Sequence, residues 1–214
     1  MTRLNIGIVG GSIAGCSAAV LLSRAGHDVT VIKRTTGRLW GRGGGIATPR
    51  PKFRALVEQD IIDADFPHTI DNEIPFVGRA SPDDRLGRTA WSLPVDLACF
   101  HWGTLWENLR EHVADESYLN GRHVAAARRE DSGDVILQLD DGSSHSFDLV
   151  IFADGNRSFG RRLVSPETDL AYRGYLLWRG MLPEGSMRDS RPLEKKMGRL
   201  SYASLDGHLV IYFV

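Results

Sequence analysis

A glycine-rich turn near the start of the chain has the residue types and spacing of a phosphate-binding loop. Residues 5–15 read NIGIVGGSIAG, an apolar run that ends in glycines and continues into small residues. Gly10, Ser12 and Gly15 occupy the three glycine positions of the dinucleotide-binding fingerprint, with Ser12 in the second. The first position makes a tight turn, the second lets the backbone approach a pyrophosphate, and the third permits close helix packing. We therefore expect a dinucleotide site here, and a plain glycine turn before a core helix is the alternative.

The backbone of this turn supplies the groups that would bind phosphate. At a helix N-terminus the N–H groups lack intrahelical partners, and the helix dipole favours an anion. We expect the N–H groups of Ser12, Ile13 and Ala14 to point at phosphate oxygens. The residues expected to contact the cofactor are Gly10, Gly11, Ser12, Ile13, Ala14 and Gly15.

The elements around the turn form a complete βαβ unit. A helix is expected over 13–25, with Gly26 as its C-cap, and a strand over 29–32. The fingerprint also requires an acid about 20 residues on, which holds a ribose hydroxyl. Lys33 and Arg34 stand there instead. Either this basic pair meets a phosphate, as the 2′-phosphate of NADP would require, or it is a solvated pair at a strand end.

Two later segments have residues suited to the same chemistry. The run GRGGG at 41–45 is either a surface loop or backbone that lies against a ligand, and Arg42 favours the ligand because a guanidinium pairs with phosphate in a fork geometry. Asp154 directly follows the apolar run 149–152. Ligands of open α/β sheets gather at the carboxyl ends of the strands, so Asp154 is expected near the first turn.

The order of the expected elements predicts an α/β fold. We expect a Rossmann-like, three-layer domain over 1–165, with 149–152 at the centre of a parallel sheet. Inserted strands around 74–93 are expected to belong to a second, substrate-side sheet. Residues 166–214 are expected to begin this mixed or antiparallel sheet and to leave it incomplete. The remaining elements expected are a helix through Pro51 to Val57, a helix between 100 and 113, strands at 123–127, 135–139 and 144–147, and later strands at 172–182, 199–203 and 208–214.

The composition is that of an ordinary globular protein, and it excludes several function classes. The 214 residues are 42% hydrophobic and 25% charged, with a net charge of −1, so no global field attracts nucleic acid or an anionic membrane. No apolar run reaches the roughly 18 residues that span a bilayer, and a cytoplasmic protein is expected. The two cysteines and seven histidines have no metal-ligand or disulfide spacing, so no metal is expected.

Three separated segments together resemble one enzyme family. They are GGSIAG at 10–15, GRGGGI at 41–46 and DLVIFADGNRSFGRR at 148–162. They resemble the single-component FAD-dependent aromatic hydroxylases, the para-hydroxybenzoate hydroxylase-like flavoprotein monooxygenases, nearest the dihydroxypyridine hydroxylase branch. The resemblance covers the N-terminal half of a family member. It implies FAD, NADH or NADPH as reductant, O2 and a small aromatic or heteroaromatic substrate, and it leaves a homodimer open.

The resemblance assigns roles to particular residues. Gly10, Ser12 and Gly15 would bind the FAD pyrophosphate, Arg42 would lie on the phosphate and ribityl side of the flavin, and Asp154 would bridge the flavin and the nicotinamide nucleotide. The oxygen chemistry belongs to the cofactor, so no general acid or base is named. The substrate-side candidates are Tyr172, Trp178 and Arg179, of which Trp178 is expected to pack in the core.

The chain also departs from the family pattern. Lys33 replaces the glutamate that normally holds the adenosine ribose, and Trp102 stands where many members carry an arginine. A second flavin-contacting motif, containing Gly-Asp, is absent from these 214 residues, as is most of the substrate sheet. We therefore expect the 214-residue chain to be inactive alone.

Two other functions remain open at this point. The chain is either catalytic or a degenerate or truncated protein that binds a nucleotide or flavin without catalysis. A remote alternative is a serine hydrolase that uses Ser12, because residues 10–14 nearly spell the G-x-S-x-G elbow. That elbow follows a central strand after several earlier ones, whereas Ser12 follows the first strand of the chain.

Overall fold

The computed structural model describes residues 2–39, 43–81, 83–84, 87–183, 186, 199–203 and 207–212. They form two compact units. The first unit comprises Met1–Leu39, Ile61–Asp63 and Leu105–Leu176, and the second comprises Trp40–Asp60, Ala64–Thr104 and Leu177–Val214. Each unit is built around its own sheet.

The first unit is built on a four-stranded parallel sheet. The chain crosses from each strand to its parallel neighbour through an intervening segment, as a βαβ unit requires. Ile6 and Ile8 on the second strand of the sheet are almost completely buried, as a strand covered on both faces demands. In order across the sheet, the strands are β10 (Leu149–Phe152), β1 (Asn5–Val9), β2 (Asp28–Lys33) and β6 (Tyr118–Asn120).

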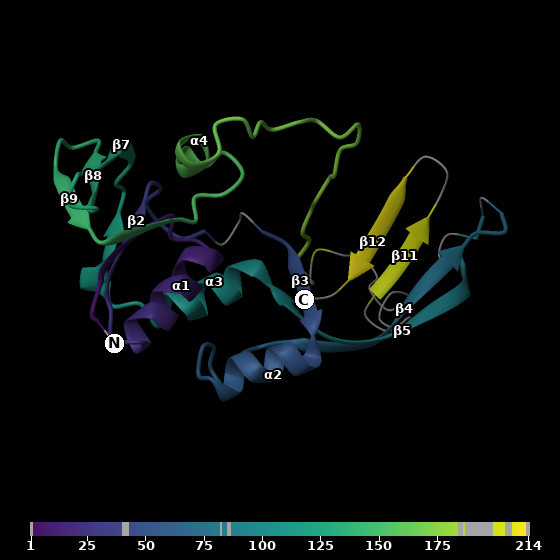
Figure 1. Ribbon diagram of the computed structural model, residues 1–214. Helices are drawn as coiled ribbons and strands as arrows, with labels where there is room; N and C mark the ends of the chain where they lie inside the picture. Colours follow the sequence, from purple (N-terminus) through teal and green to yellow (C-terminus); the bar gives the residue numbers. More distant parts are fainter. Residues whose placement is uncertain are drawn as a thin grey trace. The chain divides into compact units, whose positions relative to one another are not determined.

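Alternation along β1 divides the core of this unit into two layers. Successive side chains of a strand point to opposite faces. Ile8 faces the helix α1 (Ile13–Arg24), because a Cβ built on Gly15 would lie 3.4 Å from its Cγ2. Val9 packs on the opposite face, against Leu137, Leu139 and Phe147. The helix, the parallel sheet and a second sheet therefore form the three layers that the sequence predicts (Figure 1).

The third layer is a three-stranded antiparallel sheet. Its strands are β7 (Val124–Arg129), β8 (Val135–Leu139) and β9 (Ser144–Phe147), which pair in sequence order. The strands β8 and β9 have the bounds that the sequence predicts, joined by the turn at Gly142. Leu137 has 0% of its surface exposed, so this layer supplies a large part of the apolar core.

Three further helices contribute to the first unit, although residues 102–104, at the start of the first of these helices, belong to the second unit. The helix α3 (Trp102–Glu111) buries Leu105, Trp106 and Leu109, a spacing of three and four residues that gives a helix one apolar face. The 3-10 helix η2 (Asp115–Ser117) precedes β6. The helix α4 (Phe159–Val164) begins after Ser158, whose hydroxyl accepts a hydrogen bond from the Arg161 amide.

The second unit is a mixed five-stranded sheet with one helix on it. The helix α2 (Arg50–Glu58) has Pro51 in its first turn and buries Phe53 against Phe66 and Phe100, at ring-centroid distances of 6.2 and 5.8 Å. Only β11 and β4 pair in parallel, and the other neighbours are antiparallel. In order, the strands are β12 (His208–Tyr212), β11 (Arg199–Ala203), β4 (Thr69–Gly78), β5 (Arg88–His101) and β3 (Gly45–Pro49).

Three expectations from the sequence are wrong. The strand 149–152 lies at an edge of the parallel sheet as described, not at its centre, and Leu149 is 44% exposed. No strand forms over 172–182, and Trp178 is 89% exposed, so it does not pack in the core. Apolar and aromatic residues alone predict a strand there, but a strand also requires a neighbouring strand, and none pairs with this segment in the described part of the chain.

The sequence also missed two strands that pairing creates. β6 has only three residues and β3 contains glycine and proline, so neither has the alternating pattern that predicts a strand. Each is held by a long neighbour, because β6 pairs with β2 and β3 pairs with β5.

The core of the antiparallel layer gives a test of the fold. Leu137→Ala is expected to lower the free energy of unfolding by about 2 to 5 kcal/mol, because it removes buried methyl groups and leaves a cavity. Leu21→Ala is the matched control, since Leu21 is 49% exposed on α1 and its loss should change stability by about 0.5 kcal/mol or less. Urea unfolding followed by circular dichroism measures both. Equal effects would contradict the assignment of Leu137 to the core.

Candidate functional site

The glycine loop between β1 and α1 has no room for side chains at its first and third fingerprint positions. Gly10 has a φ of +109°, and a Cβ there would lie 2.4 Å from the carbonyl oxygen of Ala153. A Cβ on Gly15 would lie 1.7 Å from the carbonyl oxygen of Gly10. The loop is therefore closely packed against the segment after β10 and against its own helix, and glycine is required for both approaches.

The N-terminus of α1 is available to an anion. Ser12 is the N-cap, but its side chain makes no capping hydrogen bond, and the first turn holds no acidic residue. The first intrahelical bond runs from the Cys16 amide to the Ser12 carbonyl, at 2.8 Å. The amides of Ile13, Ala14 and Gly15 therefore precede the helical ladder, and the positive end of the dipole is not compensated by a side chain.

Asp154 lies on the loop that packs against Gly10. The Ala153 amide donates to the Val9 carbonyl at 2.8 Å, so this loop continues the pairing of β10 with β1. Asp154 Oδ2 accepts a hydrogen bond from the Phe159 amide at 2.7 Å. Its Oδ1 is shielded from solvent and accepts no hydrogen bond from the described residues. A shielded carboxylate oxygen without a partner is costly, so this atom marks a place for a donor on a ligand.

The carbonyl of Gly11 is held by three side chains that lie far from it in the sequence. Trp106 Nε1 donates to this oxygen at 2.9 Å, and the Tyr118 hydroxyl donates to it at 2.8 Å. The Cys16 thiol is a third donor, at 3.7 Å. Burial raises the pKa of the Cys16 thiol from 9.0 to about 11, and burial also raises the pKa of Tyr118. Both groups therefore remain protonated donors at neutral pH.

Lys33 and Arg34 have different environments. Arg34 is exposed, whereas Lys33 is only 4% exposed, so the interpretation of a solvated pair is wrong for Lys33. Lys33 Nζ donates to the Gly37 carbonyl at 2.8 Å and lies 5.0 Å from the ring centroid of Trp106 and 6.0 Å from that of Tyr118. Its charge is therefore held by a carbonyl and by two aromatic faces.

These observations fit one end of a dinucleotide better than the other. The close-packed glycines, the uncapped helix and the unpartnered Asp154 oxygen would suit a pyrophosphate and a neighbouring donor group. The ribose position differs, because an ammonium at Lys33 stands where a carboxylate would accept hydrogen bonds from the hydroxyls. The cofactor contacts of Gly10 to Gly15, Lys33, Arg34 and Asp154 stay predictions.

The described residues do not test the other positions predicted for the site. Arg42 lies outside the described residues. Tyr172 belongs to the first unit and is 73% exposed. Trp178 and Arg179 belong to the second unit, where a Cβ on Gly44 would lie 3.9 Å from Arg179 Cδ. A substrate role for these three residues stays a prediction.

Sequence reasoning missed Trp106 and Tyr118 as parts of the site. Trp106 has the spacing of a core residue on α3, which it also is. Tyr118 is separated from Gly11 by 107 residues, and no local pattern links the two. The one available signal was Lys33, since a lysine in a buried strand requires partners that hold its charge.

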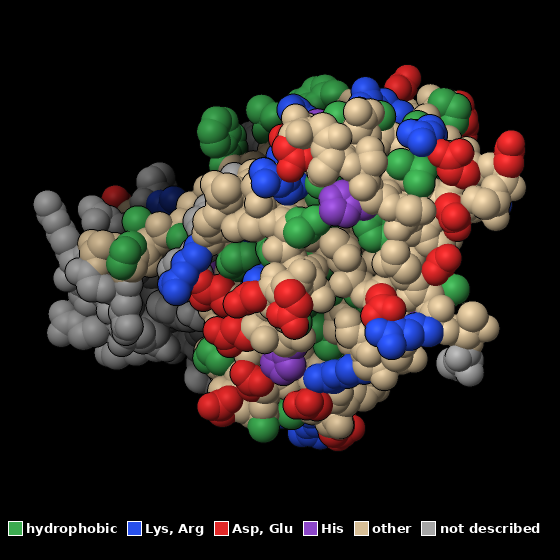
Figure 2. Space-filling view, turned by 90° about the vertical axis from the view of Figure 1, so that its left-hand side faces the viewer, with side chains coloured by type: hydrophobic (Ala, Val, Ile, Leu, Met, Phe, Trp, Pro, Cys, Tyr) green, Lys and Arg blue, Asp and Glu red, His purple; other side chains and the backbone are tan. Residues whose placement is uncertain are grey.

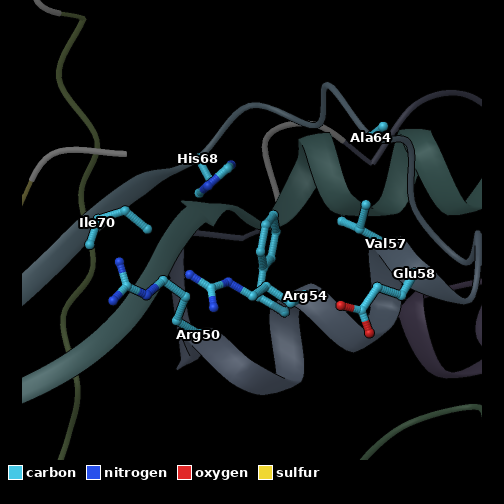
Figure 3. A pocket seen from close by; sticks show the side chains of 8 residues that line it. Arg50, Arg54, Val57, Glu58, Ala64, His68 and Ile70 are labelled. Atoms are coloured by element: carbon cyan, nitrogen blue, oxygen red, sulfur yellow. The ribbon is translucent and has the colours of Figure 1, made fainter.

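The second unit contains an open groove along α2 (Figure 3). Its volume is about 420 Å³. Arg50 pairs with Asp96, with Nε and Oδ1 2.7 Å apart. The lining also holds Arg54 and Glu58, so side chains of both charges line the groove. It is lined by Arg50, Phe53, Arg54, Val57, Glu58, Ala64, His68 and Ile70.

Among the described residues, neither the face drawn in Figure 2 nor the grouping of possible metal ligands indicates a nucleic-acid or metal site. On the face drawn in Figure 2, acidic and basic side chains lie interspersed. Among the residues that the structure describes, no three His, Cys, Asp or Glu side chains gather as a metal site would need. Across the same part of the chain, none of the helices has the length and apolarity to cross a bilayer.

Known proteins match the part of the chain that holds the glycine loop. NAD(P)-binding Rossmann-like domains match residues 8–50, which hold the glycine loop, α1 and β2. The chain is 32% identical to the 2,6-dihydroxypyridine 3-monooxygenase of Paenarthrobacter nicotinovorans, over 99% of this chain and 51% of that protein. The solved structure of 2,6-dihydroxypyridine-3-hydroxylase from Arthrobacter nicotinovorans matches with a TM-score of 0.82 at 28% identity, over 98% of this chain and 51% of that one.

The chain is homologous to half of a 2,6-dihydroxypyridine 3-monooxygenase. It is also 31% identical to the aurachin C monooxygenase/isomerase of Stigmatella aurantiaca, over 88% of this chain and 50% of that protein. The chain thus spans about half the length of these two relatives. The resemblance and the Rossmann-like fold predicted from the sequence are confirmed.

The buried thiol beside the glycine loop predicts a pH dependence of stability. Cys16 has a higher pKa in the folded chain, about 11, than its ordinary value of 9.0, so the unfolded chain loses this proton first. The stability that the neutral thiol provides is full below pH 9 and is lost as the pH rises to about 11. One such group changes the free energy of unfolding by at most about 1.4 kcal/mol per pH unit.

The variant Cys16→Ala should flatten this loss. Urea unfolding at pH 8, 9, 10 and 11 measures the slope, and a constant offset from the smaller side chain does not affect it. Tyr118, whose ordinary pKa is 10.0, keeps its own contribution in both proteins. An unchanged slope between pH 9 and 10 in Cys16→Ala would contradict the burial of this thiol.

Proposed function

We propose that this chain is the FAD-binding part of a monooxygenase that hydroxylates a small aromatic or heteroaromatic compound, using NADH or NADPH and O2. The proposal includes a cytoplasmic location, and a homodimer remains open. The relatives support it, because the two proteins that the chain matches across about half of their length are both monooxygenases. The substrate is not specified by any described residue.

One observation carries the proposal. The glycine loop after β1 and the Asp154 loop after β10 are packed together although 144 residues separate Gly10 from Asp154. The first loop presents uncapped amides, and the second presents an unpartnered carboxylate oxygen. Acceptors and donors of these types at one sheet edge suit a ligand that has both phosphate groups and hydroxyl groups.

The chain's own residues have binding and orienting roles in this proposal. The amides of Ser12, Ile13 and Ala14 would hold the pyrophosphate, and Asp154 Oδ1 would accept a hydrogen bond from the cofactor. Arg42 would contact the phosphate and ribityl side. When bound, the flavin supplies the redox and oxygen chemistry, and the protein positions it and limits water access. Tyr172, Trp178 and Arg179 remain candidates for the substrate side.

Two other functions have less support. A nucleotide-binding protein without catalysis would have the same loop. The main argument for this alternative is the ammonium of Lys33 at the position where a carboxylate would bind the ribose. A serine hydrolase would need a base beside Ser12, but the Ser12 side chain hydrogen-bonds no described side chain. The serine hydrolase does not account for the half-length match to the two monooxygenases, whereas a degenerate or truncated relative would share that match and is separated from the proposal by an activity assay.

The binding part of the proposal is tested with FAD itself. Titration of the purified chain, followed by quenching of flavin fluorescence and by calorimetry, should show one FAD site per chain. Absence of saturable FAD binding would overturn the proposal. Binding of FAD without any oxidation of NADH or NADPH by the natural gene product, with a panel of phenols and hydroxypyridines, would favour the non-catalytic alternative.

Asp154 gives a sharper test of where FAD binds. Asp154→Asn keeps one oxygen for the Phe159 amide but replaces the shielded acceptor by a donor, so stability should change little while the Kd for FAD rises about 10-fold or more. Asp131→Asn is the matched control, because the Asp131 side chain is exposed. This variant should bind FAD with the Kd of the wild type. Equal affinity in all three proteins would remove Asp154 from the site.

A further inference from the structure

The side chains beneath the glycine loop have a role that the cofactor contacts do not explain. We propose that Trp106 and Tyr118, with Lys33 against their rings, orient the Gly11–Ser12 peptide so that the Ser12 amide faces the phosphate, and thereby set the affinity for a dinucleotide that they do not touch. These are positioning residues, and the inference rests on the proposed FAD function. The term loop support is used here for Lys33, Trp106 and Tyr118.

The argument begins with the geometry of one peptide bond. The carbonyl of Gly11 and the amide of Ser12 belong to the same planar trans peptide, so they point in opposite directions. Two strong donors fix the carbonyl, Trp106 Nε1 at 2.9 Å and the Tyr118 hydroxyl at 2.8 Å. Fixing the carbonyl toward the protein interior therefore fixes the Ser12 amide on the other side of the peptide, away from these two side chains.

The two donors are held rigidly in turn. Trp106 is 5% exposed and Tyr118 is 7% exposed, so neither ring is free to rotate away. The guanidinium carbon of Arg110 lies 4.1 Å from the Tyr118 ring centroid. A Cβ on Gly11 would lie 2.2 Å from the Tyr118 hydroxyl oxygen, which shows how closely this side chain approaches the loop.

Lys33, the last residue of β2, joins the loop support to this strand. Its ammonium lies within cation–π distance of both rings and donates to the Gly37 carbonyl. The ammonium therefore attracts the two rings that carry the donors, while its hydrogen bond closes the turn after β2. Lys33 is thus part of the loop support, although it stands at the position where the dinucleotide fingerprint has a carboxylate that binds ribose.

A double-mutant cycle tests the support. Trp106→Phe and Tyr118→Phe each remove one donor and keep an aromatic ring, and each leaves the other donor on the same oxygen. We expect each single variant to raise the Kd for FAD about 2- to 3-fold, and the double variant to raise it about 20-fold, because the carbonyl then loses both strong donors. Lys33→Met, which keeps the apolar stem, should raise the Kd about 3-fold.

The readouts distinguish positioning from a general loss of stability. Calorimetry with FAD is run at a temperature where every variant is folded, and the NMR order parameter of the Ser12 N–H is measured without ligand. In the double variant this order parameter should fall from the value of a rigid backbone toward that of a flexible loop, while the order parameters of β8 stay unchanged. Tyr175→Phe is the matched control, since Tyr175 is 74% exposed in the same unit.

The outcomes separate this inference from the proposed function. A lower melting temperature with unchanged FAD affinity and an unchanged Ser12 order parameter overturns the support and makes Trp106 and Tyr118 packing residues only. Additive effects of the two single variants overturn the shared-acceptor argument. A wild-type chain that binds no FAD overturns the proposed function, and the order parameter of the Ser12 N–H then decides for or against the support by itself.

Discussion

The pairing of β10 with β1 is the constraint on which the site depends. It aligns Val9 with Phe152 and so brings the two segments that follow these strands to one edge of the sheet. Gly10 and Asp154 are 144 residues apart in the sequence, and this pairing is what brings them together in space. Gly10 must then lack a side chain, because the Ala153 carbonyl occupies the space where a Cβ would lie. Gly10 is thus required by the packing of the two paired strands, in addition to any requirement from a ligand.

The buried ammonium of Lys33 lies against the side chains that hydrogen-bond the glycine loop. Burying a lysine is unfavourable unless its charge has partners. Here a backbone carbonyl and two aromatic rings provide them, and the same rings donate to the Gly11 carbonyl. The cation and the loop are therefore stabilised by one set of side chains. A substitution at Lys33 consequently acts on loop geometry, as well as on any direct contact with a ribose.

The two units have different sequence requirements. In the first unit the parallel sheet lies between α1 and the antiparallel sheet, and its strand β1 is buried on both faces. The second unit is a mixed sheet whose long strands β4 and β5 keep exposed apolar residues such as Trp91 and Leu93. An alternating pattern therefore suffices for the second unit, whereas β1 requires a continuous apolar run.

The sequence by itself determined the first βαβ unit, the helix α2, the strands β8 to β10 and the glycine loop, because their periodicity, caps and glycine spacing are local signals. It also indicated the enzyme family through three separated segments. The tertiary structure alone decided that β10 lies at an edge, that β3 and β6 form, and that 172–182 does not pair. It also decided the environment of Lys33, since Trp106 and Tyr118 reach Gly11 from 95 and 107 residues away. Contacts over such separations depend on how the layers pack, and no local pattern encodes them.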